Sequence, residues 1–187
     1  NENRFLVREL HHRVKNSLQV IQSYIAIEAR GQTGPAHAVL VDAELRVKIM
    51  AIAYRIAMAE GTIRAVDLND FLSHAMQVVS THLRPGQIVQ PGPAEGPVLI
   101  ELEKVIALGF LFGETIIRAG RAAPRFVLTV RIVSDEEGDG VVIESDPRIV
   151  LGAAPRINRG LMLQLGARPL AGTDTDSVIA GWRWRRG

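Results

Sequence analysis

The sequence contains no cysteine, which excludes a disulfide framework, a thiol nucleophile and a cysteine-ligated metal site. It has no apolar run of the ~18 residues needed to cross a bilayer, and its first nine residues are charged and lack a signal-peptide core. We therefore expect a cytoplasmic protein with no membrane partner. An excess of one charge is also missing, because 22 Lys and Arg are balanced by 20 Asp and Glu. The small net charge of +2 predicts no broad basic face for nucleic acid.

Glycine and proline are absent from two long segments, Arg4–Arg30 and Ala36–Glu60, which favours two uninterrupted helices. Residues 31–35 between them contain two glycines and a proline and predict the tip of an antiparallel helical hairpin. Two such helices cannot bury all their apolar faces against each other. We therefore predict that residues 1–62 form a dimerisation hairpin and that two copies make a four-helix bundle in a homodimer.

Residues 63–187 are expected to form a second module that begins with a capped helix. Asp67 is a predicted N-cap for a helix over 68–83, and Asp70 complements the positive end of that helix. The other expected elements are extended segments at 87–90 and 98–101, a helix at 102–119, hairpin strands at 125–133 and 141–144, a helix at 158–165 and a strand at 177–185.

This element order predicts an α+β protein in which the helical hairpin is followed by an α/β sandwich. Trp182 and Trp184 alternate along the final strand with arginines around them, a pattern that also occurs at nucleic-acid surfaces. Core packing is the favoured interpretation for both tryptophans. The acidic run 135–137 is expected to be the solvated tip of the strand hairpin.

The first helix has two chemically distinct faces when its residues are placed at ~100° intervals. The apolar face, expected to point into the bundle, comprises Leu6, Leu10, Val14, Leu18, Ile21, Tyr24 and Ile25. The opposite, polar face comprises Arg8, His12, Lys15, Asn16, Gln19, Gln22 and Ser23. His12 lies near the middle of the polar face and is expected to meet solvent or a partner, whereas His11 lies at the edge of the apolar face and is expected to pack.

A polar face of this kind suits phosphoryl transfer. A neutral imidazole is a good nucleophile near physiological pH, and neighbouring cations offset the charge of the transferred group. Arg8 and Lys15 flank His12 at minus four and plus three, and Asn16 is placed to hydrogen-bond phosphoryl oxygens. An arbitrary exposed histidine on a charged helix has no function in most cases, so the surrounding sequence decides between the two interpretations.

Residues 9–16, Glu-Leu-His-His-Arg-Val-Lys-Asn, followed by Ser-Leu-Gln-Val-Ile at 17–21, closely resemble the phosphoacceptor box of HWE/HisKA_2-type sensor histidine kinases. The pattern of that box is His, Arg, any residue, Lys, Asn, so the resemblance implies that His12 is the phosphoacceptor. Residues 43–53 and 65–72 look like the second helix and the domain entry of the same subfamily. The resemblance therefore implies that the second module is similar to a Bergerat-type, ATP-binding sandwich.

The nucleotide motifs of these kinases are degenerate here. Family members carry an asparagine box that holds magnesium near the triphosphate, and the corresponding positions are Gly113, Glu114 and Arg118, of which only Glu114 is kept. The adenine-reading Asp-x-Gly-x-Gly motif should follow the strand 141–144, where the sequence instead has Ser145-Asp146-Pro-Arg. Side chains at the glycine positions would crowd a nucleotide. We expect no resident cofactor.

An intact phosphoacceptor box beside a damaged kinase module resembles bacterial histidine phosphotransferases. The resemblance implies that His12 shuttles phosphoryl groups between aspartates of response-regulator receiver domains, and that the receiver holds the Mg²⁺. Arg8, Arg13 and Lys15 would steer the acidic receiver pocket, with Asn16 and Gln19 beside them. Two alternatives remain: an active sensor-kinase core whose motifs are unusual, and a pseudokinase scaffold that binds a receiver domain or an anti-sigma factor without carrying phosphate.

Overall fold

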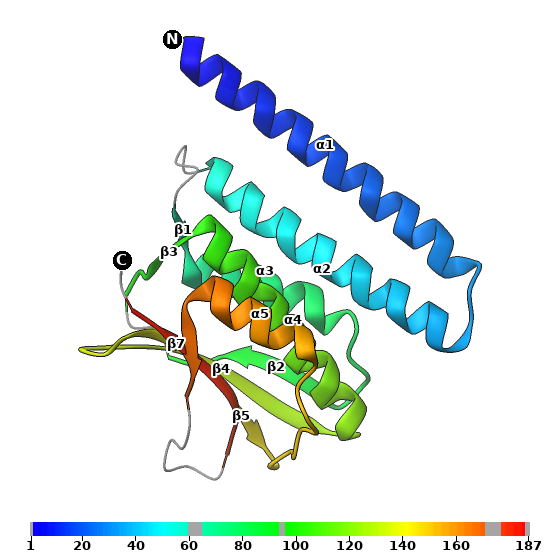
Figure 1. Cartoon of the computed structure of the whole chain (residues 1–187). Helices are drawn as coiled ribbons and strands as arrows, with labels where there is room; N and C mark the ends of the chain where they lie inside the picture. Colours follow the sequence, from blue (N-terminus) through cyan, green and yellow to red (C-terminus); the bar gives the residue numbers. More distant parts are fainter. Residues whose placement is uncertain (1, 60–64, 94–95, 171–176, 186–187) are drawn as a thin grey trace.

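The computed structural model describes residues 2–59, 65–93, 96–170 and 177–185, without the side chains of residues 2–8 and 11. The chain begins with the expected antiparallel hairpin, formed by α1 (Glu2–Arg30) and α2 (Gly34–Ala59). Helix α2 starts two residues earlier than predicted, at Gly34, whose φ of 63° suits glycine. In Figure 1, α1 is the outermost layer and α2 lies between α1 and the helices of the sandwich.

The second module contains the predicted elements and two short strands that were not predicted, β1 and β6. In chain order they are β1 (Ala65–Asp67), α3 (Leu68–Ser80), β2 (Gln87–Pro91), β3 (Leu99–Glu101), α4 (Leu102–Ala122), β4 (Phe126–Asp135), β5 (Gly138–Asp146), α5 (Arg156–Leu165), β6 (Ala167–Pro169) and β7 (Val178–Trp184). The predicted cap of α3 is confirmed, because Asp67 Oδ1 accepts a hydrogen bond from the backbone nitrogen of Asn69 at 2.9 Å.

A five-stranded sheet forms one layer of the sandwich, in the order β2-β4-β5-β7-β6. Strands β2 and β4 are parallel and the other neighbours are antiparallel. Strands β1 and β3 pair separately as a small two-stranded sheet. Helices α3, α4 and α5 cover one face of the larger sheet (Figure 1). Trp182 and Trp184 are buried, which confirms that they pack in the core.

The other face of the sheet carries polar side chains, as the two-residue period of a strand requires. Arg131 of β4 donates two hydrogen bonds to Glu144 of β5, from Nε to Oε2 at 3.1 Å and from Nη2 to Oε1 at 2.8 Å. The Arg131 guanidinium beside Glu144 lowers the pKa of this carboxyl group below its ordinary value, against the opposing effect of burial.

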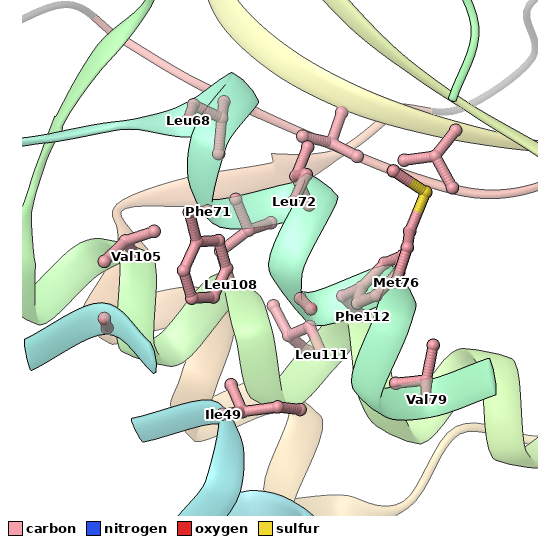
Figure 2. Packing of buried hydrophobic residues seen from close by; sticks show 14 of the residues in the cluster. Ile49, Leu68, Phe71, Leu72, Met76, Val79, Val105, Leu108, Leu111 and Phe112 are labelled. Carbon is pink, nitrogen blue, oxygen red and sulfur yellow. The ribbon is translucent and has the colours of Figure 1, made fainter. Parts of the chain in front are cut away.

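Helix α2 belongs to the core of the sandwich as well as to the hairpin. Its Ile49, Ile52 and Ile56 are buried in one cluster with side chains of α3 and α4, and Figure 2 shows Ile49 entering that cluster near Leu108 and Leu111. No partner was predicted for this face of α2. The sandwich covers it within the same chain.

A pair of glycines on α4 lets α2 approach closely. A Cβ atom on Gly109 would lie 2.5 Å from Cγ2 of Ile49, and one on Gly113 would lie 2.8 Å from Cδ1 of the same side chain. A side chain at either position would therefore force Ile49 to shift. We call Gly109 and Gly113, one helical turn apart, the glycine groove. It fixes how the hairpin sits on the sandwich.

Candidate functional site

His12 lies on an exposed face of α1, as the helical wheel predicts. At ~100° per residue, Lys15, Asn16 and Gln19 fall within ~60° of His12 around the helix axis, and all three are exposed. Gln22, expected on the same face, is half-buried at its edge. The structure therefore brings His12 together with one cation and two amide side chains on a single solvent-facing surface.

The remaining candidate residues on α1 are Arg13 and Arg8. Arg13 is about 100° away around the helix, and its Nε donates to Oε1 of Glu9 at 2.9 Å in an exposed ion pair. Arg8 is part of α1, but its side chain lies outside the described residues, as does the side chain of His11. The predicted preference for His12 over His11 therefore rests on the sequence.

The apolar face of α1 divides into a covered and an uncovered part. Leu18 is buried against α2, and Val14 and Ile25 are half-buried beside it, as expected. Other large apolar side chains of α1 are at least 45% exposed in the single chain: Leu10, Val20, Ile21, Tyr24 and Ile27. We call these five residues the exposed stripe. Leu10, Ile21 and Tyr24 lie about 120–180° around the helix from His12, and Val20 and Ile27 lie two turns or more beyond it along α1, so most of the stripe is away from His12.

The candidate nucleotide positions lie on α4, where it meets α2 and the start of α5. Gly113, Glu114 and Arg118 line a cavity of about 120 Å³, together with Asp42 and Arg46 of α2. Glu114 and Arg118 form an ion pair, with Nε of Arg118 3.4 Å from Oε1 of Glu114. Both side chains are mostly buried, at 11% and 18% exposure.

Two longer-range contacts hold these side chains in place. Nδ2 of Asn158, at the start of α5, donates to Oε2 of Glu114 at 3.1 Å. Nη2 of Arg118 donates to the backbone carbonyl of Gly152, in the loop before α5. Asn158 was missed at the level of sequence. Its signal was a polar residue that falls on the buried side of a short amphipathic helix.

Ser145 and Asp146 do not join this cavity. They end β5, where Oγ of Ser145 donates to the carbonyl of Pro147 at 2.7 Å and the backbone nitrogen of Ser145 donates to Ser177 at 2.8 Å. Asp146 is exposed. The structure thus brings three of the five candidate nucleotide positions together. Among the described residues, no group of three or more His, Asp and Glu side chains could hold a metal ion.

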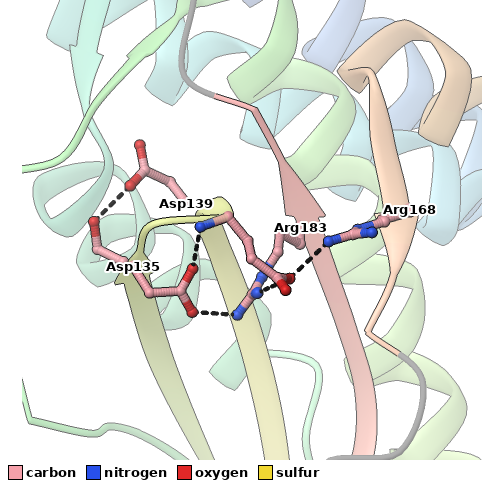
Figure 3. A network of polar contacts seen from close by, with 6 residues as sticks. Asp135, Asp139, Arg168 and Arg183 are labelled. Atoms are coloured by element: carbon pink, nitrogen blue, oxygen red, sulfur yellow. Dashed lines mark hydrogen bonds and ion pairs between the residues drawn. The ribbon is translucent and has the colours of Figure 1, made fainter.

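A second polar network lies at the opposite end of β5, around the tip of the β4–β5 hairpin (Figure 3). Arg183 of β7 bonds to Asp135 at 2.7 Å and to Glu137 at 2.6 Å, and Arg168 of β6 also bonds to Glu137 at 2.7 Å. The acidic run is exposed as expected, but two of its carboxylates are paired. This network fastens β6 and β7 to the hairpin tip and does not touch the His12 face.

Residues 9–82 match the model of the family HisKA_2, described as histidine kinase. This segment, which is less than half of the 187-residue chain, is similar to that family. The matched segment contains α1 from Glu9 onward, α2, β1 and α3, and therefore His12 and its neighbours. No curated protein is similar to the chain in sequence. Among the described helices, none is both long and apolar enough to cross a membrane.

Solved histidine kinases share the fold of most of this chain. The histidine kinase domain of the blue-light activated histidine kinase from Erythrobacter litoralis aligns over 88% of this chain and 94% of its own, with a TM-score of 0.62 and 15% identity. A longer structure of that kinase aligns over 92% of this chain and 58% of its own, with a TM-score of 0.57 and 17% identity. The histidine kinase AdeS from Acinetobacter baumannii aligns over 92% of this chain and 95% of its own, with a TM-score of 0.50 and 10% identity.

Proposed function

We propose that this chain is a histidine phosphotransferase of a two-component phosphorelay, in which His12 carries phosphoryl groups between receiver-domain aspartates without ATP. One observation carries the proposal. His12 is exposed on a face with Lys15, Asn16 and Gln19, inside the segment that matches the histidine kinase family. An exposed imidazole is open to a receiver domain that docks along α1.

The transfer needs little chemistry from this chain. A ring nitrogen of His12 forms a bond to phosphorus while the bond from phosphorus to the receiver's aspartate oxygen breaks, and the carboxylate leaves. The second receiver reverses the step. The receiver would supply the Mg²⁺, while Lys15 offsets charge and Asn16 donates to a phosphoryl oxygen. The exposed Arg13–Glu9 pair is worth only ~0–1 kcal/mol, so Arg13 is free to reorient toward an acidic partner.

The surroundings of Gly113, Glu114 and Arg118 support transfer without ATP. A side chain at Gly113 would meet Ile49, the Glu114 carboxylate is bonded to Asn158, and the Arg118 guanidinium is bonded to Gly152. These residues do not fit a magnesium–nucleotide complex, because the polar groups of Glu114 and Arg118 are already engaged within the chain and Gly113 has no side-chain oxygen for Mg²⁺.

The exposed stripe supports the homodimer that we propose for this chain. It places five large apolar side chains on one side of α1, and such a patch on a helical hairpin is typical of a surface that pairs with a second copy. Because the stripe is distinct from the His12 face, a dimer formed through it would leave His12 accessible to receivers.

Incubation with a radiolabelled phospho-receiver tests the proposal. The wild-type chain should become labelled, His12→Ala should lose all label, and the control His74→Ala should keep it, because His74 lies on α3 and bonds to Asp70. Full labelling of His12→Ala would refute the assignment. Incubation with labelled ATP and Mg²⁺ should leave the wild-type chain unlabelled, and self-labelling would instead identify an active kinase. An unchanged signalling output of His12→Ala in cells would identify a scaffold.

A further inference from the structure

We infer that Glu114 and Arg118 form an internal latch, which holds the loop 147–155 and the start of α5 against α4 without any ligand. The inference rests on the proposed function in one respect: it identifies the side chains that hold the loop and the start of α5 in place when no nucleotide is bound. It concerns side chains of one helix that reach two segments much later in the sequence.

Arg118 ties the second part of the loop to α4. Its guanidinium bridges the Glu114 carboxylate one turn earlier on α4 and the carbonyl of Gly152, 34 residues further along the chain. Within the described residues, no backbone hydrogen bond joins 148–154 to another element. Ile149 anchors the first part of the loop in the core, but residues 152–155 are exposed. The position of that second part therefore depends on Arg118.

Glu114 plays a similar role for the first turn of α5, whose later turns are anchored in the core by Leu165. Asn158 is 8% exposed, and its Oδ1 has no hydrogen-bond partner among the described residues. A buried amide is costly unless it is hydrogen-bonded, so the bond from Nδ2 to Glu114 is what stabilises Asn158 in this position. The outer side of α5, at Ile157 and Leu163, contacts little, since both side chains are exposed.

The two charges of the latch depend on each other. Each side chain is more than four-fifths buried, where an ion pair interacts strongly and an unpaired charge is unfavourable. Removing Arg118 would leave the Glu114 carboxylate buried without its countercharge and would also free the Gly152 carbonyl. An anionic ligand entering here would have to displace Arg118 from both partners.

Hydrogen exchange of the full chain, followed by mass spectrometry, tests the latch. In the wild type without nucleotide, the amides of the first turn of α5 over 158–161, which donate hydrogen bonds at the start of the helix, should be protected. Arg118→Ala should raise their exchange rates about tenfold to a hundredfold, the range expected for loss of a charge-assisted hydrogen bond, while β4 and β5 keep their protection. Glu114→Gln, which keeps an acceptor for Asn158 but loses the charge, should give a smaller increase.

Arg121→Ala is the matched control. Arg121 lies on the same helix and pairs with Asp42 of α2 at 3.1 Å, so its removal should leave exchange over 158–161 unchanged. If Arg118→Ala lowers the overall stability too far for a clear reading, Glu114→Gln gives the answer under native conditions. Wild-type exchange rates in both variants would overturn the latch, as would protection of residues 158–161 in the wild type only after ATP and Mg²⁺ are added.

Label transfer from a phospho-receiver, measured on the same samples, separates the two proposals. Normal labelling of His12 with unchanged exchange in Arg118→Ala would remove the latch and leave the phosphotransferase proposal in place. Raised exchange in Arg118→Ala, together with a wild-type chain that accepts no label, would establish the latch and remove the phosphotransferase proposal.

Discussion

The two helices of the hairpin are similar in length, at 29 and 26 residues, yet they differ in what they bury. Among the described side chains of α1, only Leu18 and Ala29 are buried, whereas α2 buries six residues, most of them against α3 and α4. Apolar periodicity tells that a helix has a face to cover. It does not predict which element covers that face, and the two helices of this hairpin differ in that respect.

The largest difference between the helices should appear on truncation of one isoleucine in each. Ile49→Ala on α2 removes a fully buried side chain and should lower the free energy of unfolding by ~2–5 kcal/mol. Ile27→Ala on α1 removes an exposed one and should change it by less than ~0.5 kcal/mol. Chemical denaturation at low protein concentration, where self-association does not contribute, measures both. Equal losses would contradict the division between a core helix and an outer helix.

A smaller effect is expected from filling the glycine groove that receives α2. Gly109→Ala gains helix propensity but places its Cβ 2.5 Å from Ile49 and 2.7 Å from Cζ of Phe71, so we expect a net loss of ~1–3 kcal/mol. The same change should cost less in an Ile49→Ala background. Gly160→Ala on α5 is the control, because open space surrounds that position and the propensity gain of up to ~1 kcal/mol should appear. A stabilised Gly109→Ala variant would show that the close approach of α2 is not needed.

The smallest change in chain stability should come from the exposed stripe, although its effect on assembly should be large. Replacing both Ile21 and Tyr24 by Ser should alter the unfolding free energy of the dilute chain by less than ~1 kcal/mol, because both side chains are exposed. Light scattering should report a dimer for the wild type and a monomer for the double variant. A wild-type chain that is monomeric at high concentration would refute the proposed homodimer.

Local signals made most of the fold predictable from the sequence. Gly-free and Pro-free stretches predict the long helices, Asp67 predicts the cap of α3, and alternation predicts β4 and β7. The packing of α2 against the sandwich was not predicted. At ~100° per residue, Ile49 and Ile56 lie opposite Leu40 and Val47, and a helix that is apolar on both sides is a buried helix. The Gly-x-x-x-Gly spacing at 109–113 was the second signal.

The candidate sites were predictable to different degrees for a physical reason. His12 and its neighbours share one helix, so the wheel alone predicts their common exposed face. Glu114 and Arg118 also share one helix, but their partners Gly152 and Asn158 are 34 and 44 residues away from them in sequence. Contacts of that range follow from how α5 is folded back on α4, and no local pattern encodes them.

Helix α2 belongs to both the hairpin and the core of the sandwich, and this has a consequence for cleavage of the chain after α2. A peptide ending just after α2 would expose Ile49, Ile52 and Ile56 to water. The complementary peptide would expose the glycine groove of Gly109 and Gly113. Each fragment would thus expose an apolar surface that is complementary to the surface of the other fragment. Two such pieces made in one cell would tend to reassemble by complementation, and each made alone would tend toward aggregation.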